Sequence, residues 1–190
     1  SKILMRKTVI IAILAASVGY SLMSFIMTAT PLQIVNVCKL GDSASATVIQ
    51  WHVIAMFAPS FFTGSVINFL GNRKVMIIGV ILYIISICVG VMGKTIEYFW
   101  ISLFLCGLGW NFLYVGGSDI IAKSSLPEER AKVQGVTDFI IFIFVASGSF
   151  LAGILHNNLG WEIMMFYTSI PIFILFLSIV FINTREMRTI

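Results

Sequence analysis

The sequence predicts an all-α integral membrane protein with six transmembrane helices and both termini in the cytoplasm. The chain is 59% hydrophobic and 11% charged, whereas soluble domains are roughly half apolar and a quarter charged. Six long apolar stretches each approach the ~20 residues that a helix needs to cross the hydrocarbon core of a bilayer. Lysines and arginines gather in alternate connections between these stretches.

The six predicted spans cover residues 8–30, 46–70, 75–92, 98–122, 133–155 and 163–182. Helices are expected because backbone amides in lipid must find partners within their own segment. The connections are too short for a soluble domain, so residues 1–190 are expected to form a single bundle. The first span is expected to be retained, because its apolar run exceeds the roughly 7–15 residues of a signal peptide core.

Basic residues orient these spans. Ten of the twelve lysines and arginines precede the first span, lie in the second or fourth connection, or follow the sixth span: Lys2, Arg6, Lys7, Arg73, Lys74, Lys123, Arg130, Lys132, Arg185 and Arg188. Only Lys39 and Lys94 fall in odd-numbered connections. Because basic residues near span ends are retained in the cytoplasm, both termini are predicted to lie there. The net charge of +4 therefore reflects orientation and contact with the lipid bilayer, and no nucleic-acid partner is expected.

Local signals predict where helices begin and turn. Ser125 is expected to cap a helix whose first turn holds Pro127, with Glu128 returning to the cap amide. The fifth helix is therefore predicted to start near Leu126. The dipeptide Gly71-Asn72 predicts a tight turn between the second and third helices.

Polar side chains are concentrated in four spans. They include Tyr20 in the first, Gln50, His52 and Asn68 in the second, Asn111 and Asp119 in the fourth, and Gln134 and Asp138 in the fifth. Because intramembrane ionisable groups face protein or water, these four spans are expected to line an interior or cavity, while the third and sixth face lipid. This two-plus-one pattern occurs twice and predicts two three-helix repeats. Gly19-Tyr20-Ser21 and Gly109-Trp110-Asn111 lie at similar depths in the first helix of each repeat.

The turn after the second span carries a family signature. It reads Gly64-Ser-Val-Ile-Asn68-Phe69-Leu70-Gly71-Asn72-Arg73-Lys74. This resembles the loop of the major facilitator superfamily, which runs glycine, three residues, aspartate, a basic residue, any residue, glycine, any residue and two basic residues. Asn68 replaces the aspartate and Phe69 the basic residue, while the glycines and the final basic pair match. The turn at 127–130 also resembles the loop before that family's eleventh helix.

The resemblance covers nearly the whole chain and implies helices seven to twelve, the C-terminal half, of a twelve-helix transporter. It implies secondary transport of a small-molecule substrate by alternating access in the plasma membrane (the bacterial inner membrane). Two acids and one histidine in or near the spans favour a link to protons, with a uniporter or a solute exchanger as the alternative. The resemblance also implies a second six-helix half as partner, upstream in the same chain, in another copy or in another subunit. No cofactor or metal site is expected, because the three cysteines are odd in number and widely spaced.

Two intramembrane residues are the main candidates for proton coupling or substrate binding. Asp138 lies in the fifth span with Gln134 one turn earlier on the same face. A carboxyl at this depth is costly to ionise and suits proton exchange; the alternative is a structural carboxyl bonded to neighbouring helices. His52, close to Gln50, suits a proton relay or substrate contact; the alternative is a hydrogen-bonded interfacial histidine.

Further candidates are weighed against structural roles. Trp110, Asn111, Tyr114 and Tyr20 suit substrate contact, with helix-to-helix contact as the alternative. Asp119, one turn before Lys123, suits either an i,i+4 ion pair or a gate contact. Ser149 and Gly153 fit close packing of small residues. Five residues of the signature turn are candidates for a gating loop: Gly64, Asn68, Gly71, Arg73 and Lys74.

Two other classes of function compete with transport. The chain suits a half-subunit that assembles with or regulates another protein without transporting alone. An intramembrane serine protease is a further alternative, because Ser147 and Ser149 flank a glycine. That chemistry needs a histidine at comparable depth, but His156 lies at the outer boundary and His52 on another helix. The chain is therefore not expected to be an enzyme.

Overall fold

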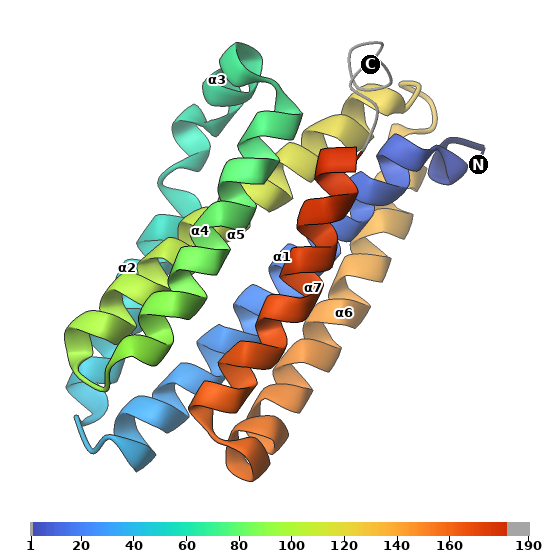
Figure 1. Cartoon of the computed structure of the whole chain (residues 1–190). Coiled ribbons are helices and arrows are strands. Elements are labelled where there is room, and N and C mark those ends of the chain that lie inside the picture. Colours follow the sequence, from blue (N-terminus) through green and yellow to red (C-terminus); the bar gives the residue numbers. More distant parts are fainter. Residues whose placement is uncertain (1, 182–190) are drawn as a thin grey trace.

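The computed structural model describes residues 2–181. All regular elements in that range are helical, which confirms the all-α membrane class (Figure 1). Five helices are each long and apolar enough to cross a membrane, and two shorter ones, bent by 45° at the break between them, together make a sixth candidate span. The elements are η1 (Lys2–Met5), α1 (Lys7–Pro31), η2 (Leu32–Val37), α2 (Asp42–Phe57), α3 (Ser60–Leu70), α4 (Asn72–Met92), α5 (Ile96–Ser124), α6 (Arg130–Leu159) and α7 (Trp161–Phe181).

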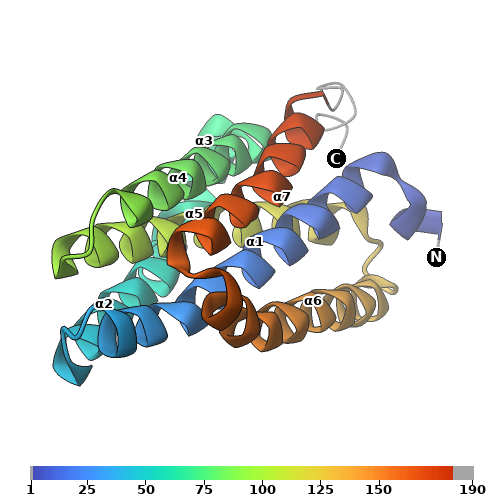
Figure 2. The ribbon, with the colours of Figure 1, turned by 60° about the horizontal axis from the view of Figure 1, so that its bottom comes forward.

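Helices α1 and α5 lie at the centre of the bundle. Helix α1 packs against α5, α6 and α7, while α5 packs against α1, α2 and α4. Figures 1 and 2 show α6 on one flank of this central pair and α2 with α3 on the other. The bundle therefore places α1, α2, α5 and α6 around one side, with α4 and α7 behind.

Burial within the chain follows this packing rather than the polar content of each helix. In the most apolar stretch of each helix, 56% of the residues are buried in α1 and α5, 44% in α4 and 22% in α6. Helix α6, one of the four spans expected to line an interior or cavity, is therefore the least buried of these helices within this chain. The reason is that α6 packs mainly against α1 and leaves its other face open. Phe139, Phe142 and Phe150 lie on that open face and are exposed.

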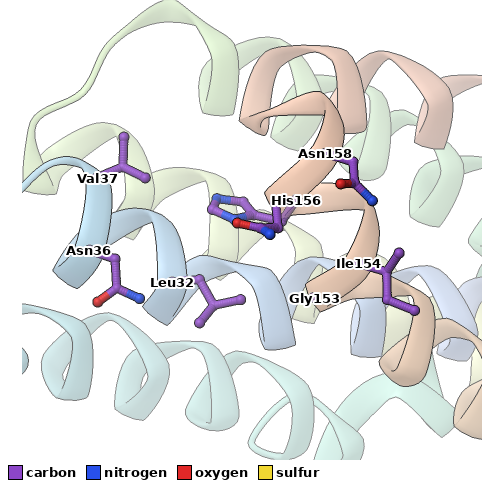
Figure 3. Close-up of a pocket in the computed structure, with 8 residues that line it drawn as sticks. Leu32, Asn36, Val37, Gly153, Ile154, His156 and Asn158 are labelled. Atoms are coloured by element: carbon purple, nitrogen blue, oxygen red, sulfur yellow. The ribbon is translucent and has the colours of Figure 1, made fainter.

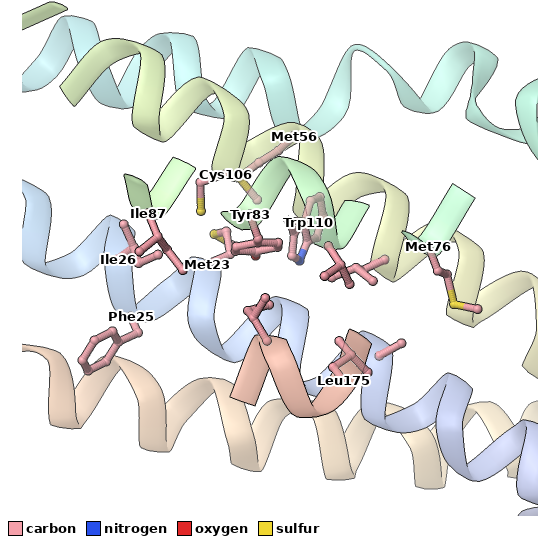
Figure 4. Packing of buried hydrophobic residues seen from close by; sticks show 14 of the residues in the cluster. Met23, Phe25, Ile26, Met56, Met76, Tyr83, Ile87, Cys106, Trp110 and Leu175 are labelled. Atoms are coloured by element: carbon pink, nitrogen blue, oxygen red, sulfur yellow. The ribbon is translucent and has the colours of Figure 1, made fainter. Parts of the chain in front are cut away.

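Tight contacts among glycines and one tyrosine join α1, α4 and α5. Figure 4 shows this tyrosine, Tyr83, among the buried side chains of the core. A β-carbon at Gly79 would stand 3.0 Å from the Gly109 carbonyl, and one at Gly109 would stand 2.8 Å from the Tyr83 ring. The Tyr83 hydroxyl then reaches past α5 and donates to the Gly19 carbonyl of α1 at 2.5 Å. Both glycine tripeptides noted in the sequence therefore meet at a single buried tyrosine.

The predicted span at 46–70 is divided. Helix α2 ends at Phe57 and α3 starts at Ser60, because Pro59 has no amide hydrogen to continue the α2 ladder. The main-chain bonds across the break instead run from Phe61 to Ala58 at 3.4 Å and from Thr63 to Pro59 at 2.8 Å.

The predicted start of the fifth helix near residue 126 is wrong. Helix α6 begins at Arg130. The Ser125 hydroxyl donates to the Ile121 carbonyl at 2.7 Å instead of capping the next helix. The last carbonyls of a helix lack intrahelical partners, so this serine satisfies the end of α5 and a turn at 126–129 follows.

The connections separate the charges by end of the bundle. Gly71 joins α3 to α4 with a φ of 84°, a conformation that favours glycine. Its connection lies at the same end as the starts of α1 and α6 (Figure 1), as do seven basic residues in this part of the chain: Arg6, Lys7, Arg73, Lys74, Lys123, Arg130 and Lys132. Lys39 and Lys94 lie at the other end. Residue 182, Arg185 and Arg188 lie outside the described residues, and the cytoplasmic location of the basic end stays a prediction.

Candidate functional site

Five aromatic side chains from α1, α2, α5 and α6 form a contiguous group, called here the aromatic cluster: Tyr20, Phe57, Trp110, Tyr114 and Phe142. Trp110 and Tyr114, one turn apart on α5, stack with ring centroids 5.1 Å apart and planes at 9°. Tyr20 meets both edge-on, at 5.1 Å from Trp110 and 5.6 Å from Tyr114. Phe57 lies 5.7 Å from Trp110, and Phe142 lies 6.1 Å from Tyr20. These geometries are the offset and edge-to-face arrangements that aromatic pairs prefer.

The aromatic cluster grades from the protein interior to an open face. Trp110 is 4% exposed, whereas Phe57 and Phe142 are each 56% exposed. Tyr20 and Tyr114 are half-buried between them. The structure thus brings together three residues predicted from sequence and adds two phenylalanines. Sequence reasoning missed these two because a phenylalanine in a membrane span suits lipid equally well.

The indole of Trp110 has an unused donor. Its Nε1 atom is buried and has no hydrogen-bond partner among the described residues. An unpaired buried N–H is costly, because water no longer solvates it. An acceptor atom of a bound molecule would satisfy the donor in a conformation that uncovers this edge of the indole, and the neighbouring rings would cover the apolar surface of that molecule.

The predicted pair on α6 lies next to this cluster. Gln134 donates from Nε2 to Asp138 Oδ1 at 2.8 Å, and both side chains are part-buried. The carboxyl is close enough to the Tyr114 hydroxyl for the two groups to interact electrostatically. A titratable group and an aromatic surface therefore share the α5–α6 side of the bundle.

His52 occupies a different place, in the seam between α2 and α5. Its Nδ1 lies 2.7 Å from the Leu103 carbonyl, and the ring is fully buried. Gly107 permits this approach, because a β-carbon there would stand 2.7 Å from the His52 carbonyl. Gln50, two residues earlier, is exposed. The contacts of His52 match the hydrogen-bonded structural alternative, although its Nε2 is buried without a partner in the described part of the chain.

Asn111 is fully buried beside the α2–α3 break rather than facing the aromatic cluster's open side. Its Nδ2 donates to the Met56 carbonyl at 2.7 Å and to Ser60 Oγ at 2.6 Å. Its Oδ1 accepts from Thr63 Oγ1 at 2.6 Å. All three partners lie on α2 or α3, so this carboxamide holds a broken helix against α5.

Asp119 and Arg73 make polar contacts that tie helices together at the basic end. Asp119 Oδ2 lies 2.7 Å from Lys123 Nζ and accepts from Asn72 Nδ2 at 2.9 Å. Arg73 donates from Nε to the Ile179 carbonyl at 3.2 Å and from a terminal nitrogen to the Val180 carbonyl at 2.5 Å. The signature turn is therefore anchored to both α5 and α7.

The remaining residues of that turn make fewer contacts. Gly64, Asn68 and Lys74 are exposed, and a β-carbon at Gly64 would meet no atom within 4 Å. Gly71 is the residue of this turn whose positive φ favours glycine. Within the described residues, the gating-loop candidates thus divide into an anchored half and an open half.

A seam of small residues between α1 and α6 was only partly predicted. Ser21 Oγ donates to the Phe144 carbonyl at 2.8 Å, and Ser24 Oγ lies 2.6 Å from Ser149 Oγ. A β-carbon at Gly148 would stand 2.6 Å from Ser21 Oγ, whereas one at Gly153 would meet nothing within 4 Å. The close contact thus involves Ser149 as expected, with Gly148 and not Gly153.

Comparison with known proteins identifies relatives over almost the whole chain. The model of the Major Facilitator Superfamily matches residues 6–189. The riboflavin transporter RfnT of Brucella anthropi is 42% identical over 161 residues, which make up 85% of this chain and 40% of RfnT.

Two further relatives are more distant. The uncharacterized MFS-type transporter YdeG of Bacillus subtilis is 32% identical over 154 residues, or 79% of this chain and 35% of YdeG. The riboflavin transporter RibZ of Clostridioides difficile is 24% identical over 146 residues, or 76% of this chain and 32% of RibZ. The chain thus spans less than half the length of these relatives.

Proposed function

This chain belongs to the major facilitator superfamily, and we propose that it forms the C-terminal six-helix half of a carrier that moves riboflavin or a closely related neutral flavin by alternating access. The family is one of multi-pass membrane carriers and not of enzymes, so the protease alternative is set aside. The match to less than half of each relative supports the idea that a second six-helix half completes the pathway.

The aromatic cluster carries this proposal. Riboflavin is a planar tricyclic ring with several carbonyl and ring-nitrogen acceptors and a neutral polyhydroxylated side chain. Trp110 offers a buried N–H without a partner in the described residues, and its stacked neighbour Tyr114 extends a flat aromatic wall. Ligand sites of this kind are mostly apolar and aromatic with a few placed polar groups. Two relatives named as riboflavin transporters support the choice of substrate.

The open face of the bundle supports the need for a second half. Phe57 and Phe142 form the exposed edge of the aromatic cluster, and α6 leaves most of its apolar length uncovered. A second half placed against this face would enclose the aromatic cluster between two bundles, which is where alternating-access carriers hold substrate.

Asp138 is proposed as the proton-coupling group. Its carboxyl lies near Tyr114 of the aromatic cluster and accepts a hydrogen bond from Gln134. A carboxyl in this position can exchange a proton when the cavity opens to water on either side. Because Asp138 lies next to the aromatic cluster, the charge of its carboxyl would depend on whether the substrate site is occupied.

The experiment is uptake of radiolabelled riboflavin into proteoliposomes that contain this chain joined to a second six-helix half. The expected result is saturable uptake that unlabelled riboflavin blocks and that a proton gradient accelerates. Saturable uptake without a response to the gradient would leave riboflavin transport standing and remove proton coupling. Riboflavin uptake equal to that of protein-free vesicles would overturn the proposal and favour a half-subunit with an assembly role.

A further inference from the structure

A cavity lies far from the aromatic cluster, between the C-terminal end of α1 with η2 and the last turns of α6 (Figure 3). Its volume is about 530 Å³, within the ~300–1,000 Å³ of small-molecule sites. Tyr20 and Gln33 are thirteen residues apart on one nearly continuous helix, which corresponds to ~20 Å. One ligand therefore does not fill both places. The cavity is lined by Leu32, Asn36, Val37, Gly153, Ile154, His156, Asn157 and Asn158.

The polar lining is uncharged. It consists of three carboxamides, Asn36, Asn157 and Asn158, and the imidazole of His156. Each carboxamide offers two N–H donors and one carbonyl acceptor. The hydrogen bonds described in this region join His156, Gln33 and Cys38 and leave the three carboxamides without a described protein partner. These groups are exposed and available to a ligand.

The histidine is held in place from behind. His156 Nε2 lies 2.9 Å from Gln33 Oε1, and both side chains are buried. Because a carbonyl oxygen only accepts, Nε2 carries the hydrogen and Nδ1 of the neutral ring remains an acceptor. Trp161 packs edge-on with its centroid 6.5 Å from the imidazole and is itself anchored to the Gly90 carbonyl at 2.7 Å. The imidazole that contributes to the lining is therefore held in one orientation.

The backbone of η2 differs from the helices around it. It is a π-helix over Leu32–Val37, at the end of α1, and it contributes Leu32, Asn36 and Val37 to the cavity wall. Single π-helical turns are rare and frequently occur at functional sites. The same wall thus supplies one carboxamide and two apolar surfaces.

We propose that this cavity binds a neutral polyhydroxylated small molecule. Neighbouring hydroxyls each donate and accept, which matches carboxamides that do the same and an imidazole acceptor. A charged ligand would lose hydration without an opposite charge in the lining. Leu32, Val37 and Ile154 cover the C–H faces of such a chain. The inference rests on the proposed function in one respect: the ribityl chain of riboflavin is such a polyol, so the cavity would be its first contact at the end opposite the basic connections.

The test is saturation-transfer NMR on the complete chain in phosphatidylcholine nanodiscs, with ribitol and with lumiflavin, a flavin ring without the ribityl chain. Ribitol is expected to receive saturation from the protein. The Asn157→Ala/Asn158→Ala double variant should weaken ribitol binding about tenfold, as expected for the loss of two modest hydrogen bonds, and leave lumiflavin binding unchanged. Thr47→Ala serves as the control, because Thr47 is an exposed polar residue at the same end whose hydroxyl bonds within α2. Circular dichroism checks that each variant keeps its helix content.

The outcomes separate the cavity from the proposed function. Lumiflavin binding without ribitol binding, or ribitol binding that the double variant does not change, would overturn the polyol site and leave the flavin carrier intact. Ribitol binding without lumiflavin binding would support the polyol site and overturn the flavin carrier. A polyol is also present in lipid headgroups, so the measurement is repeated in phosphatidylglycerol nanodiscs. Persistence of the ribitol signal supports a free solute, and its disappearance assigns the cavity to the lipid headgroup and overturns the proposal.

Discussion

The side-chain amide of Asn111 on α5 donates a 2.7 Å hydrogen bond to the main-chain carbonyl of Met56 on α2. Met56 lies one turn before the break at Pro59, where the main-chain bonds shift to Ala58 and Pro59 as acceptors. Asn111 therefore supplies from α5 a donor that the interrupted ladder of α2 does not provide. Breaks in membrane helices are tolerated where neighbouring side chains satisfy the freed backbone groups, and this pair is such a case.

Replacing Asn111 by leucine is expected to lower the thermal stability of the chain. The change leaves the Met56 carbonyl buried without a donor, which costs ~1–3 kcal/mol. The reporter is the thiol of Cys106, which is fully buried, labelled by a thiol-reactive dye on heating. The measurement uses a background in which Cys38 and Cys88 are serine. Asn68→Leu, on the exposed face of α3, is the control, and equal midpoints for both variants would contradict the structural role of Asn111.

Removing the indole N–H of Trp110 is expected to weaken riboflavin binding. Trp110→Phe keeps an aromatic ring in the stack with Tyr114 but deletes the donor that has no partner in the described residues. The loss of one hydrogen bond, ~0.5–1.5 kcal/mol, corresponds to a rise in Kd of about twofold to tenfold. Quenching of riboflavin fluorescence by the chain in nanodiscs measures it. Trp51→Phe is the matched control, since Trp51 pairs with Trp100 away from the aromatic cluster; the same loss in both variants would remove Trp110 from the site.

Asp138→Asn is expected to abolish proton movement linked to riboflavin in the complete carrier. The asparagine keeps the size of the side chain and an acceptor for Gln134, which donates at 2.8 Å, so packing is retained while titration is lost. Alkalinisation or acidification of lightly buffered proteoliposomes during riboflavin addition measures the coupled proton. Gln134→Leu tests the hydrogen bond separately and should reduce, not eliminate, the coupled flux. A normal pH change in Asp138→Asn would assign coupling to another group.

Local sequence patterns predicted those features whose causes are local. Hydropathy located the helices because a membrane span must be apolar along its length, and the spacing of Asp119 and Lys123 predicted their 2.7 Å ion pair because i and i+4 are neighbours on a helix. The similar tripeptides Gly19-Tyr20-Ser21 and Gly109-Trp110-Asn111 place Tyr20 and Trp110 at similar depths, and the centroids of the two rings lie 5.1 Å apart.

Features that depend on distant partners were not predictable in the same way. Ser125 has the pattern of an N-terminal cap, yet its hydroxyl bonds back to Ile121, because a serine serves either neighbouring helix end. Phe57 and Phe142 join the aromatic cluster only because α2 and α6 flank the central pair. Nothing in a run of apolar residues distinguishes a phenylalanine that faces a site from one that faces lipid.

Arg73→Lys is expected to loosen the end of α7 even though it retains the charge. The guanidinium donates to two successive carbonyls, Ile179 and Val180, over 100 residues away in sequence. The guanidinium presents two N–H donors in a planar fork, and a lysine ammonium does not reproduce the fork that reaches both carbonyls. Hydrogen exchange of the amides at 175–181 should accelerate by about tenfold, corresponding to ~1.4 kcal/mol. Lys74→Arg is the matched control, because Lys74 is the adjacent exposed basic residue, and its exchange pattern should equal that of the unsubstituted chain. Unaltered exchange in Arg73→Lys would show that charge alone, and not the paired donors, holds the signature turn against α7.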